Sequence, residues 1–263
     1  MLVAVFVTAT SSVAEAQGIG DLYQAMTIIT GTDMRSRPTG FAQCLREVLV
    51  KVSGEPRLLG DPRVEELATH ADALVRSFTY VDPRAAIRPH DDQGTYDRSQ
   101  DFTVRFDPAA VDKALAALGE QPWRGERPAV VPVILVRGFA PPWTGVYLLT
   151  AEEMAGVAQR ASFANSAIKY GIRVRVPTAG EISAWGISVD RFPSQPAAAS
   201  STEVPVSGTL EFQPAALGWV GSWRMRWHDT DYSWGVSGVG FDEAFDDLVR
   251  GTMRIVSGHG SPE

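Results

Sequence analysis

The segment from Gln121 to Pro128, Gln-Pro-Trp-Arg-Gly-Glu-Arg-Pro, constrains the fold of this 263-residue chain more than any other. Its two prolines and its glycine interrupt regular structure, because proline lacks a backbone N–H and glycine is conformationally free. We therefore expect two small domains, at residues 17–121 and 129–257, joined by a linker at residues 122–128. Residues 258–263 form a short tail in this division.

The N-terminal half has the pattern β-α-α-β-β-α. A strand is predicted over residues 22–31, and a helix over residues 39–53, where apolar residues recur at helical spacing. Gly54 is placed to end this helix, and Asp61 with the following proline is placed to begin the next. The remaining elements are strands over residues 78–81 and 102–106 and a helix that begins at Asp107 and Pro108.

The C-terminal half opens with a β-branched run at residues 129–136, typical of a buried strand, in which Pro132 favours an edge position or a bulge. A helix over residues 150–169 and a strand over residues 172–176 follow. Next come strands over residues 205–212, 219–227 and 232–239 and a helix over residues 241–256. The pattern predicts an α+β protein of two small α/β-sandwich-like domains, each a mostly antiparallel sheet covered by helices.

The first 16 residues have the layout of an export signal. The apolar run Leu2–Val7 is followed by Ala14-Glu15-Ala16, an A-x-A cleavage pattern that predicts a mature start at Gln17. The run is shorter than the roughly 20 residues that a membrane-spanning helix needs, so the mature chain is predicted to have no transmembrane segment. The alternative is a buried first strand, Leu2–Thr8, in a cytosolic protein.

Charge and cysteine content exclude two classes of protein. The net charge is −7 and no stripe of lysine and arginine is present, which argues against nucleic-acid binding, because phosphate neutralisation needs clustered basic side chains. Cys44 is the only cysteine, so no intramolecular disulfide can form. Its position in an amphipathic helix favours a small core residue over a catalytic thiol.

Motifs of common cofactor and metal sites are absent. The sequence has no P-loop, no complete dinucleotide fingerprint, no H-E-x-x-H, no cysteine pair and no G-x-S-x-G, so we predict neither a cofactor nor a metal. Two turns place histidine beside aspartate: His90-Asp91-Asp92 and His228-Asp229-Thr230-Asp231. Aspartate favours turns for backbone reasons, which explains both runs. The alternatives are a cation site and a periplasmic hydrolase that uses His228, Asp229 and Asp231.

Aromatic residues are concentrated near the C-terminus. Four of the seven tryptophans lie in one stretch: Trp219, Trp223, Trp227 and Trp234. On an unbroken strand the first three share a face. This face is predicted to pack under the final helix, with Trp223 against Phe245 and Leu248. The alternative is a surface on which these four tryptophans bind a partner.

Several short runs are distinctive as a set. The N-terminal runs are Leu49–Gly54, Asp61–Val64, Phe78–Tyr80, Val104–Val111 and Pro122–Pro128, and looser ones are Gly221–Trp227 and Trp234–Gly238. Together they resemble an uncharacterised bacterial envelope family, domain of unknown function 2066. The resemblance implies a secreted or periplasmic protein of Gram-negative bacteria. It brings no established activity and no catalytic residues.

The sequence therefore predicts an exported, non-catalytic protein of the periplasm that binds a protein or a glycan of the cell envelope. A hydrolase based on the His228 turn and a purely structural subunit with a large flat interface remain open. An exposed apolar patch or an open sheet edge would favour the binding protein. A concave pocket where His228 and the two aspartates converge would favour the enzyme.

Overall fold

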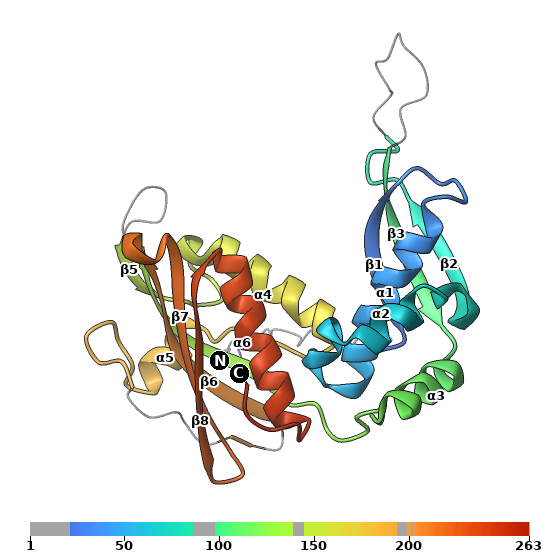
Figure 1. Ribbon diagram of the computed structural model, residues 1–263. Helices are drawn as coiled ribbons and strands as arrows, with labels where there is room; N and C mark the ends of the chain where they lie inside the picture. Colours follow the sequence, from blue (N-terminus) through green and yellow to red (C-terminus); the bar gives the residue numbers. More distant parts are fainter. Residues whose placement is uncertain (1–21, 87–97, 139–144, 194–198, 201, 263) are drawn as a thin grey trace, which may run out of the picture.

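A computed structural model of the chain describes residues 22–86, 98–138, 145–193, 199–200 and 202–262. It contains one sheet of three strands and one of five, each packed against helices, which confirms the predicted α+β class. Figure 1 shows that the two sheets belong to two lobes that diverge from a shared base. We call residues 22–118 the N-lobe, residues 119–128 the connector and residues 129–256 the C-lobe.

The N-lobe sheet has the order β1-β3-β2, and both pairings are antiparallel. Its strands are β1 (Gln24–Thr30), β2 (Val75–Val81) and β3 (Ser99–Phe106). Alternation along β3 buries Phe102, Val104 and Phe106 on one face, which helix α1 (Arg37–Ser53) covers. Gly40 permits this close packing, because a Cβ there would lie 2.6 Å from the ring of Phe102.

Local signals begin and end the N-lobe helices where the sequence predicts. Gly54 ends α1 in the left-handed conformation, with a φ of 78°. Asp61 and Asp107 each accept a backbone hydrogen bond at the start of a helix whose first residue is proline. These helices are α2 (Pro62–Ala68) and α3 (Pro108–Leu118), and the short 3-10 turns are η1 (Pro56–Gly60) and η2 (Ala71–Leu74).

The C-lobe sheet has the order β5-β4-β6-β7-β8, in which only β4 and β6 are parallel. The strands are β4 (Ala129–Gly138), β5 (Gly145–Leu148), β6 (Glu203–Gln213), β7 (Gly218–Trp227) and β8 (Thr230–Val239). The three C-terminal strands and the strand at residues 129–136 are confirmed. β7 and β8 form an antiparallel hairpin, and the two residues His228 and Asp229 make the turn between them.

Pro132 explains why a further predicted strand does not form. Residues 172–176 contribute only one parallel bridge, Val174 to Val130, so the predicted strand is wrong. The N–H of Val130 donates to the carbonyl of Arg173 at 2.8 Å. By alternation, Pro132 turns its nitrogen to the same side, and without an N–H it cannot extend this ladder.

Two long helices pack against the C-lobe sheet, α4 (Val157–Tyr170) and α6 (Phe241–Val256). The final helix has the predicted bounds, whereas the helix predicted over residues 150–169 begins only at Val157. Gly156 is its N-cap, and glycine is a poor residue for a helix interior. The other C-lobe helices are α5 (Ala179–Ala184), η3 (Met154–Gly156) and η4 (Pro214–Ala216).

The hydrophobic core is continuous between the lobes. The buried apolar side chains of α1 and β3 belong to the same cluster as those of β4, β7 and α6. Val52 near the end of α1 is 2% exposed. The lobes therefore share buried surface at their base, although their sheets are separate.

Candidate functional site

The structure places the four predicted tryptophans mainly in the core. Trp219, Trp223 and Trp234 are buried, and Trp227 is half-buried. Trp223 lies with Phe245 and Leu248 in one buried cluster, as expected for a sheet face under α6. Its indole Nε1 donates to Asp247 Oδ2 at 3.1 Å. The three buried indoles present no stacking face to a partner in this conformation.

The His228 turn lies at the exposed tip of the β7–β8 hairpin. His228 and Asp229 have φ values of 46° and 60°, as a two-residue type I′ turn requires. Asp231 accepts a hydrogen bond from Arg226 Nε at 2.6 Å across the hairpin. Turn geometry and a cross-strand ion pair account for these residues.

His90, Asp91 and Asp92 lie outside the described residues, as does the predicted signal at residues 1–16. Cys44 is fully buried, and burial raises the pKa of its thiol to about 12, so it is no reactive thiolate. In the part of the chain that the structure describes, no cluster of three His, Cys, Asp or Glu side chains could hold a metal ion.

The outer face of the N-lobe sheet, opposite α1, is the clearest candidate interaction surface. Met26 and Ile28 on β1 are 51% and 66% exposed, and Val81 on β2 is 56% exposed. Strand register places Ile28 and Val81 on either side of Asp101, in one row across the three strands. We call this surface the outer face. β1 and β2 are the two outermost strands of the sheet, so each also has an outer edge in the described structure.

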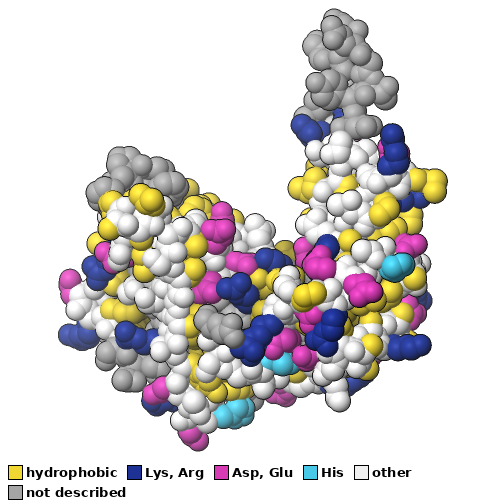
Figure 2. Space-filling view, viewed as in Figure 1, with side chains coloured by type: hydrophobic (Ala, Val, Ile, Leu, Met, Phe, Trp, Pro, Cys, Tyr) yellow, Lys and Arg dark blue, Asp and Glu magenta, His cyan; other side chains and the backbone are white. Residues whose placement is uncertain are grey.

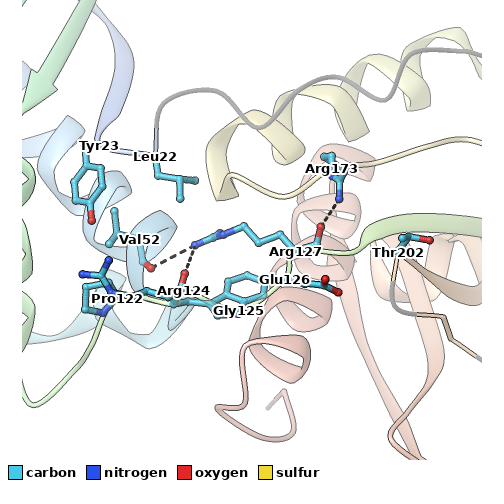
Figure 3. A pocket seen from close by; sticks show the side chains of 11 residues that line it. Leu22, Tyr23, Val52, Pro122, Arg124, Gly125, Glu126, Arg127, Arg173 and Thr202 are labelled. Carbon is cyan, nitrogen blue, oxygen red and sulfur yellow. Dashed lines mark hydrogen bonds between the residues drawn. The ribbon is translucent and has the colours of Figure 1, made fainter.

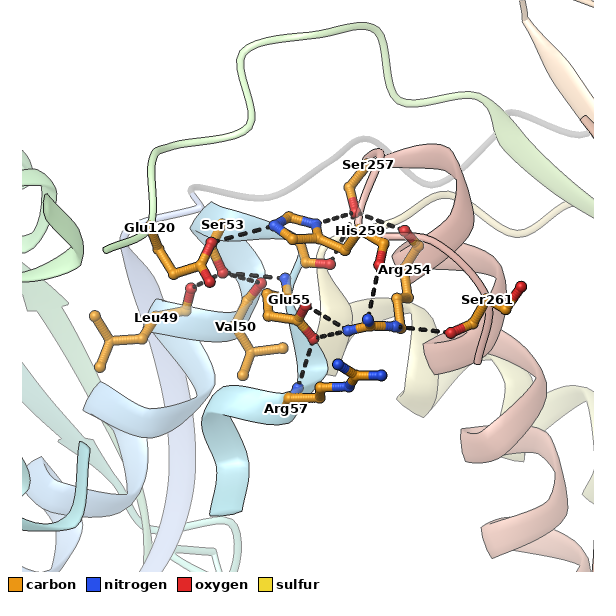
Figure 4. Close-up of polar contacts among 11 residues, drawn as sticks. Leu49, Val50, Ser53, Glu55, Arg57, Glu120, Arg254, Ser257, His259 and Ser261 are labelled. Atoms are coloured by element: carbon orange, nitrogen blue, oxygen red, sulfur yellow. Dashed lines mark hydrogen bonds and ion pairs between the residues drawn. The ribbon is translucent and has the colours of Figure 1, made fainter. Parts of the chain in front are cut away.

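A second candidate region is the lobe junction, where charged side chains gather in the centre of Figure 2. Arg254 of α6 forms a buried ion pair with Glu55, which follows α1, and Ser257 Oγ donates to the carbonyl of Gly54 at 2.9 Å. His259 Nε2 lies 3.2 Å from Glu120 of the connector. Figure 4 shows these contacts joining the end of α6 to the end of α1.

A further polar group joins α4 to α6 beside α1. Tyr170 donates its hydroxyl to Asp246 at 2.6 Å, and Lys169 pairs with the same carboxylate at 3.0 Å. Burial, followed by the charge of Asp246, holds the pKa of Tyr170 well above its usual range. Glu47 of α1 faces this group, and burial raises the pKa of its carboxyl. The hydrogen bond and the ion pair therefore join α4 to α6 within the C-lobe, and the N-lobe meets them through the charge of Glu47.

The junction also holds a pocket of about 650 Å³. Leu22, Tyr23 and Val52 come from the N-lobe, residues 122–127 from the connector, and Arg173 with Thr202 from the C-lobe. Figure 3 shows the side chain of Arg127 reaching from the connector to the backbone of α1. Arg127 Nη2 donates to the carbonyl of Lys51 at 2.9 Å.

Sequence reasoning did not single out the junction residues. In the sequence, Arg127 and Glu55 look like ordinary charged residues of a linker and a loop. The ion pair of Glu55 with Arg254 joins two positions that are 199 residues apart, so no local pattern predicts it. The one available signal was the dense run Trp-Arg-Gly-Glu-Arg at residues 123–127, which combines an aromatic ring with three charges. Such a run is unusual for a flexible linker.

A family model described as Domain of unknown function (DUF8605) matches residues 16–124. The chain is similar to this family over its N-lobe. The match spans β1 to α3 and ends inside the connector. Comparisons with curated proteins and with solved structures gave no match. Within the described residues, no helix is long and apolar enough to cross a membrane.

The resemblance to domain of unknown function 2066 is therefore wrong, since the matching family model is a different one. The structure gives the reason. Leu49–Gly54 is the last turn of α1 with its glycine cap, and Asp61 with Pro62 is a helix start. Such residues recur wherever a helix ends or begins, so they report local structure rather than ancestry. Expected export then rests on the N-terminal run Leu2–Ala16 alone.

Proposed function

We propose that this protein acts in the bacterial cell envelope as an exported, non-catalytic binding protein, and that its partner is another envelope protein. The outer face carries this proposal. Exposed aliphatic side chains on a sheet face that the described helices leave uncovered mark an interaction surface. The A-x-A pattern at Ala14–Ala16 supports export.

The chemistry of the outer face favours a protein over a glycan. Sugar rings bind best to exposed aromatic faces, whereas the exposed side chains here are those of Met26, Ile28 and Val81. Asp101, Thr103 and Arg105 on the central strand β3 lie between the aliphatic residues of β1 and β2. A surface that mixes apolar and polar side chains in this way is typical of protein–protein contacts.

The edges of the sheet offer a second mode of contact to the same partner. In the part of the chain that the structure describes, β1 pairs with β3 alone, so its other edge can accept an extended segment by strand addition. The exposed residues Met26 and Ile28 lie on that edge strand. A partner strand alongside β1 would therefore gain backbone hydrogen bonds and apolar contact together.

The test compares two matched substitutions in the tagged full-length chain. Ile28→Arg places a charge on the outer face, and Met154→Arg makes the same change at a residue of η3 that is 82% exposed in the C-lobe. Both variants should melt like the parent protein, because both positions are exposed. We expect Ile28→Arg alone to abolish recovery of one specific envelope protein. Equal recovery by both variants would refute binding through the outer face.

Localisation is tested separately by fractionation with N-terminal sequencing of the chain. The proposal requires a periplasmic protein that begins at Gln17. A cytosolic protein that retains Met1 would refute export while leaving the binding result to stand.

A further inference from the structure

We infer that the junction pocket binds a small organic oxyanion, whose carboxylate or phosphate group faces Arg124, Arg127 and Arg173 and whose apolar part contacts Trp123. This site is separate from the outer face, so its test does not depend on whether an envelope partner binds there. All four residues line the same pocket.

The first observation is a charge imbalance in the pocket lining. Three arginines, Arg124, Arg127 and Arg173, line the pocket with one carboxylate, that of Glu126, and of the three only Arg124 pairs with a carboxylate beyond the lining, that of Asp112 at 3.0 Å, among the described residues. Glu126 is exposed, and neither a hydrogen bond nor an ion pair links it to these arginines in the described structure. The pocket therefore has a positive surplus that an anion would neutralise.

The second observation is that the most buried of the three arginines, Arg127, has no carboxylate partner among the described residues. Arg127 is 6% exposed and donates only to carbonyl oxygens, including that of Gly171 at 3.2 Å. Burial lowers its pKa to about 10. A buried charge is normally paired, so Arg127 raises the electrostatic benefit of an anion nearby.

Arg173 strengthens this argument from the C-lobe side. Its Nη2 donates to the carbonyl of Arg127 at 2.8 Å, while its Nε is buried without a hydrogen-bond partner. Among the described residues it forms no ion pair. Arg127 and Arg173 therefore both lack a carboxylate partner among the described residues, and a bound oxyanion would supply the missing counter-charge.

The apolar lining indicates that the anion is organic. Trp123 stacks on the guanidinium of Arg127, with 4.1 Å between the ring centroid and Cζ. Leu22 and Val52 complete an apolar wall next to the charged one. The hydroxyl of Tyr23 is held by Asp112 at 2.8 Å, which fixes its ring at the pocket. A ligand with an apolar body and one charged group matches both walls.

Calorimetric titration of the full chain at low salt tests the inference with three probes: phenyl phosphate, benzoate and inorganic phosphate. We expect at least one organic probe to bind, more tightly than inorganic phosphate and more weakly as salt is added. Phenyl phosphate and benzoate together decide between a phosphate and a carboxylate. No binding of either organic probe, or equal binding of inorganic phosphate, would overturn the inference.

Three variants locate the binding. Arg173→Gln should weaken the organic probe about tenfold or more, since a hydrogen bond to a charged group is lost. Glu126→Gln should tighten binding several-fold, because it removes the one negative charge of the lining. Arg226→Gln, on the β7–β8 hairpin, is the matched control and should bind like the parent.

The opposite sign of the two effects distinguishes a specific site from a general loss of structure. If Arg173→Gln lowers the melting temperature, Glu126→Gln decides alone, since its side chain is exposed. Unchanged or weaker binding by Glu126→Gln would overturn the site. Loss of binding by Arg226→Gln to the same degree as Arg173→Gln would also overturn it.

Discussion

Arg254 near the end of the last helix and Glu55 just after the first helix form a buried ion pair, although 199 residues separate them in the sequence. Both side chains are 8% exposed. Arg254 also donates to the carbonyls of Ser261 and His259, so it holds the C-terminal residues against the junction. This pair fastens the base of one lobe to the base of the other.

Replacing Arg254 by methionine should lower the free energy of unfolding by about 3–5 kcal/mol, because the carboxylate of Glu55 is left buried without its partner. Denaturant titration measures this change. The double variant Arg254→Met with Glu55→Leu should lose less than the sum of the two single variants. Arg226→Gln, which removes an exposed ion pair, should change little. Additive losses in the double variant would contradict a coupled pair.

Gly54 provides a second measure of the contact between the lobes. Its φ is +78°, and a Cβ there would lie 2.5 Å from the Cβ of Ser257, the residue that caps the end of α6. Gly119 has a φ of +86° with no atom near an added Cβ. Gly119→Ala should therefore cost only backbone strain, about 1 kcal/mol, while Gly54→Ala should cost clearly more. Equal losses in thermal melts would mean that the lobes do not pack closely at Gly54.

A substitution at Trp223 tests the prediction that the tryptophan face of β7 belongs to the hydrophobic core. Trp223→Ala should cost about 3–5 kcal/mol, the usual penalty for emptying a large buried site. Trp185→Ala, at a tryptophan that is 47% exposed, is the matched control and should cost much less. If the melting temperature of the Trp223 variant stayed at the parent value, β7 would have to be reconsidered as a binding strand.

The sequence was sufficient for most of the helices and strands, because local chemistry decides them. Gly54, Asp61 and Asp107 mark helix ends through backbone conformation and capping, and both depend only on neighbouring residues. The exception at residues 172–176 depended on Pro132, some 40 residues away, whose missing N–H stops the ladder. Strand pairing is non-local, so alternation alone overstated that strand.

The candidate surfaces were harder to predict. The alternation along β1 is clear, but alternation does not tell which face of the strand is buried. Only the fold shows that α1 covers the face opposite Met26 and Ile28. The pocket depends on Arg127 and Arg173, which meet only after the connector folds back between the lobes. The sequence shows that both side chains are charged. Only the fold shows that neither has a carboxylate counter-ion among the described residues.

Glu47 gives the stability a specific pH dependence. Burial raises the pKa of its carboxyl above 4.5 in the folded protein, against the effect of Lys51 and Lys169. The folded state therefore holds this proton more tightly, and the resulting stability is present below pH 4.5 and lost as the pH rises through the folded-state pKa. Glu47→Gln should raise the melting temperature at pH 7, with a gain that shrinks below pH 4.5.

Glu65 is the matched control for that pH series. Hydrogen bonds from Arg46 lower the pKa of its carboxyl, so its ionised form stabilises the fold, and the effect is lost as the pH falls through the lowered pKa. Glu65→Gln should therefore lower the melting temperature at pH 7. A shift of the same sign in both variants would contradict the assigned environments.

The central claim is that the outer face of the N-lobe sheet contacts an envelope protein, and site-specific photocrosslinking in cells tests it most directly. A photoreactive residue at Ile28 should give one discrete adduct with a different envelope protein, and the same residue at Met154 in the C-lobe should give none. No adduct at Ile28, the same adduct at both positions, or an adduct of two copies of this chain would contradict the account.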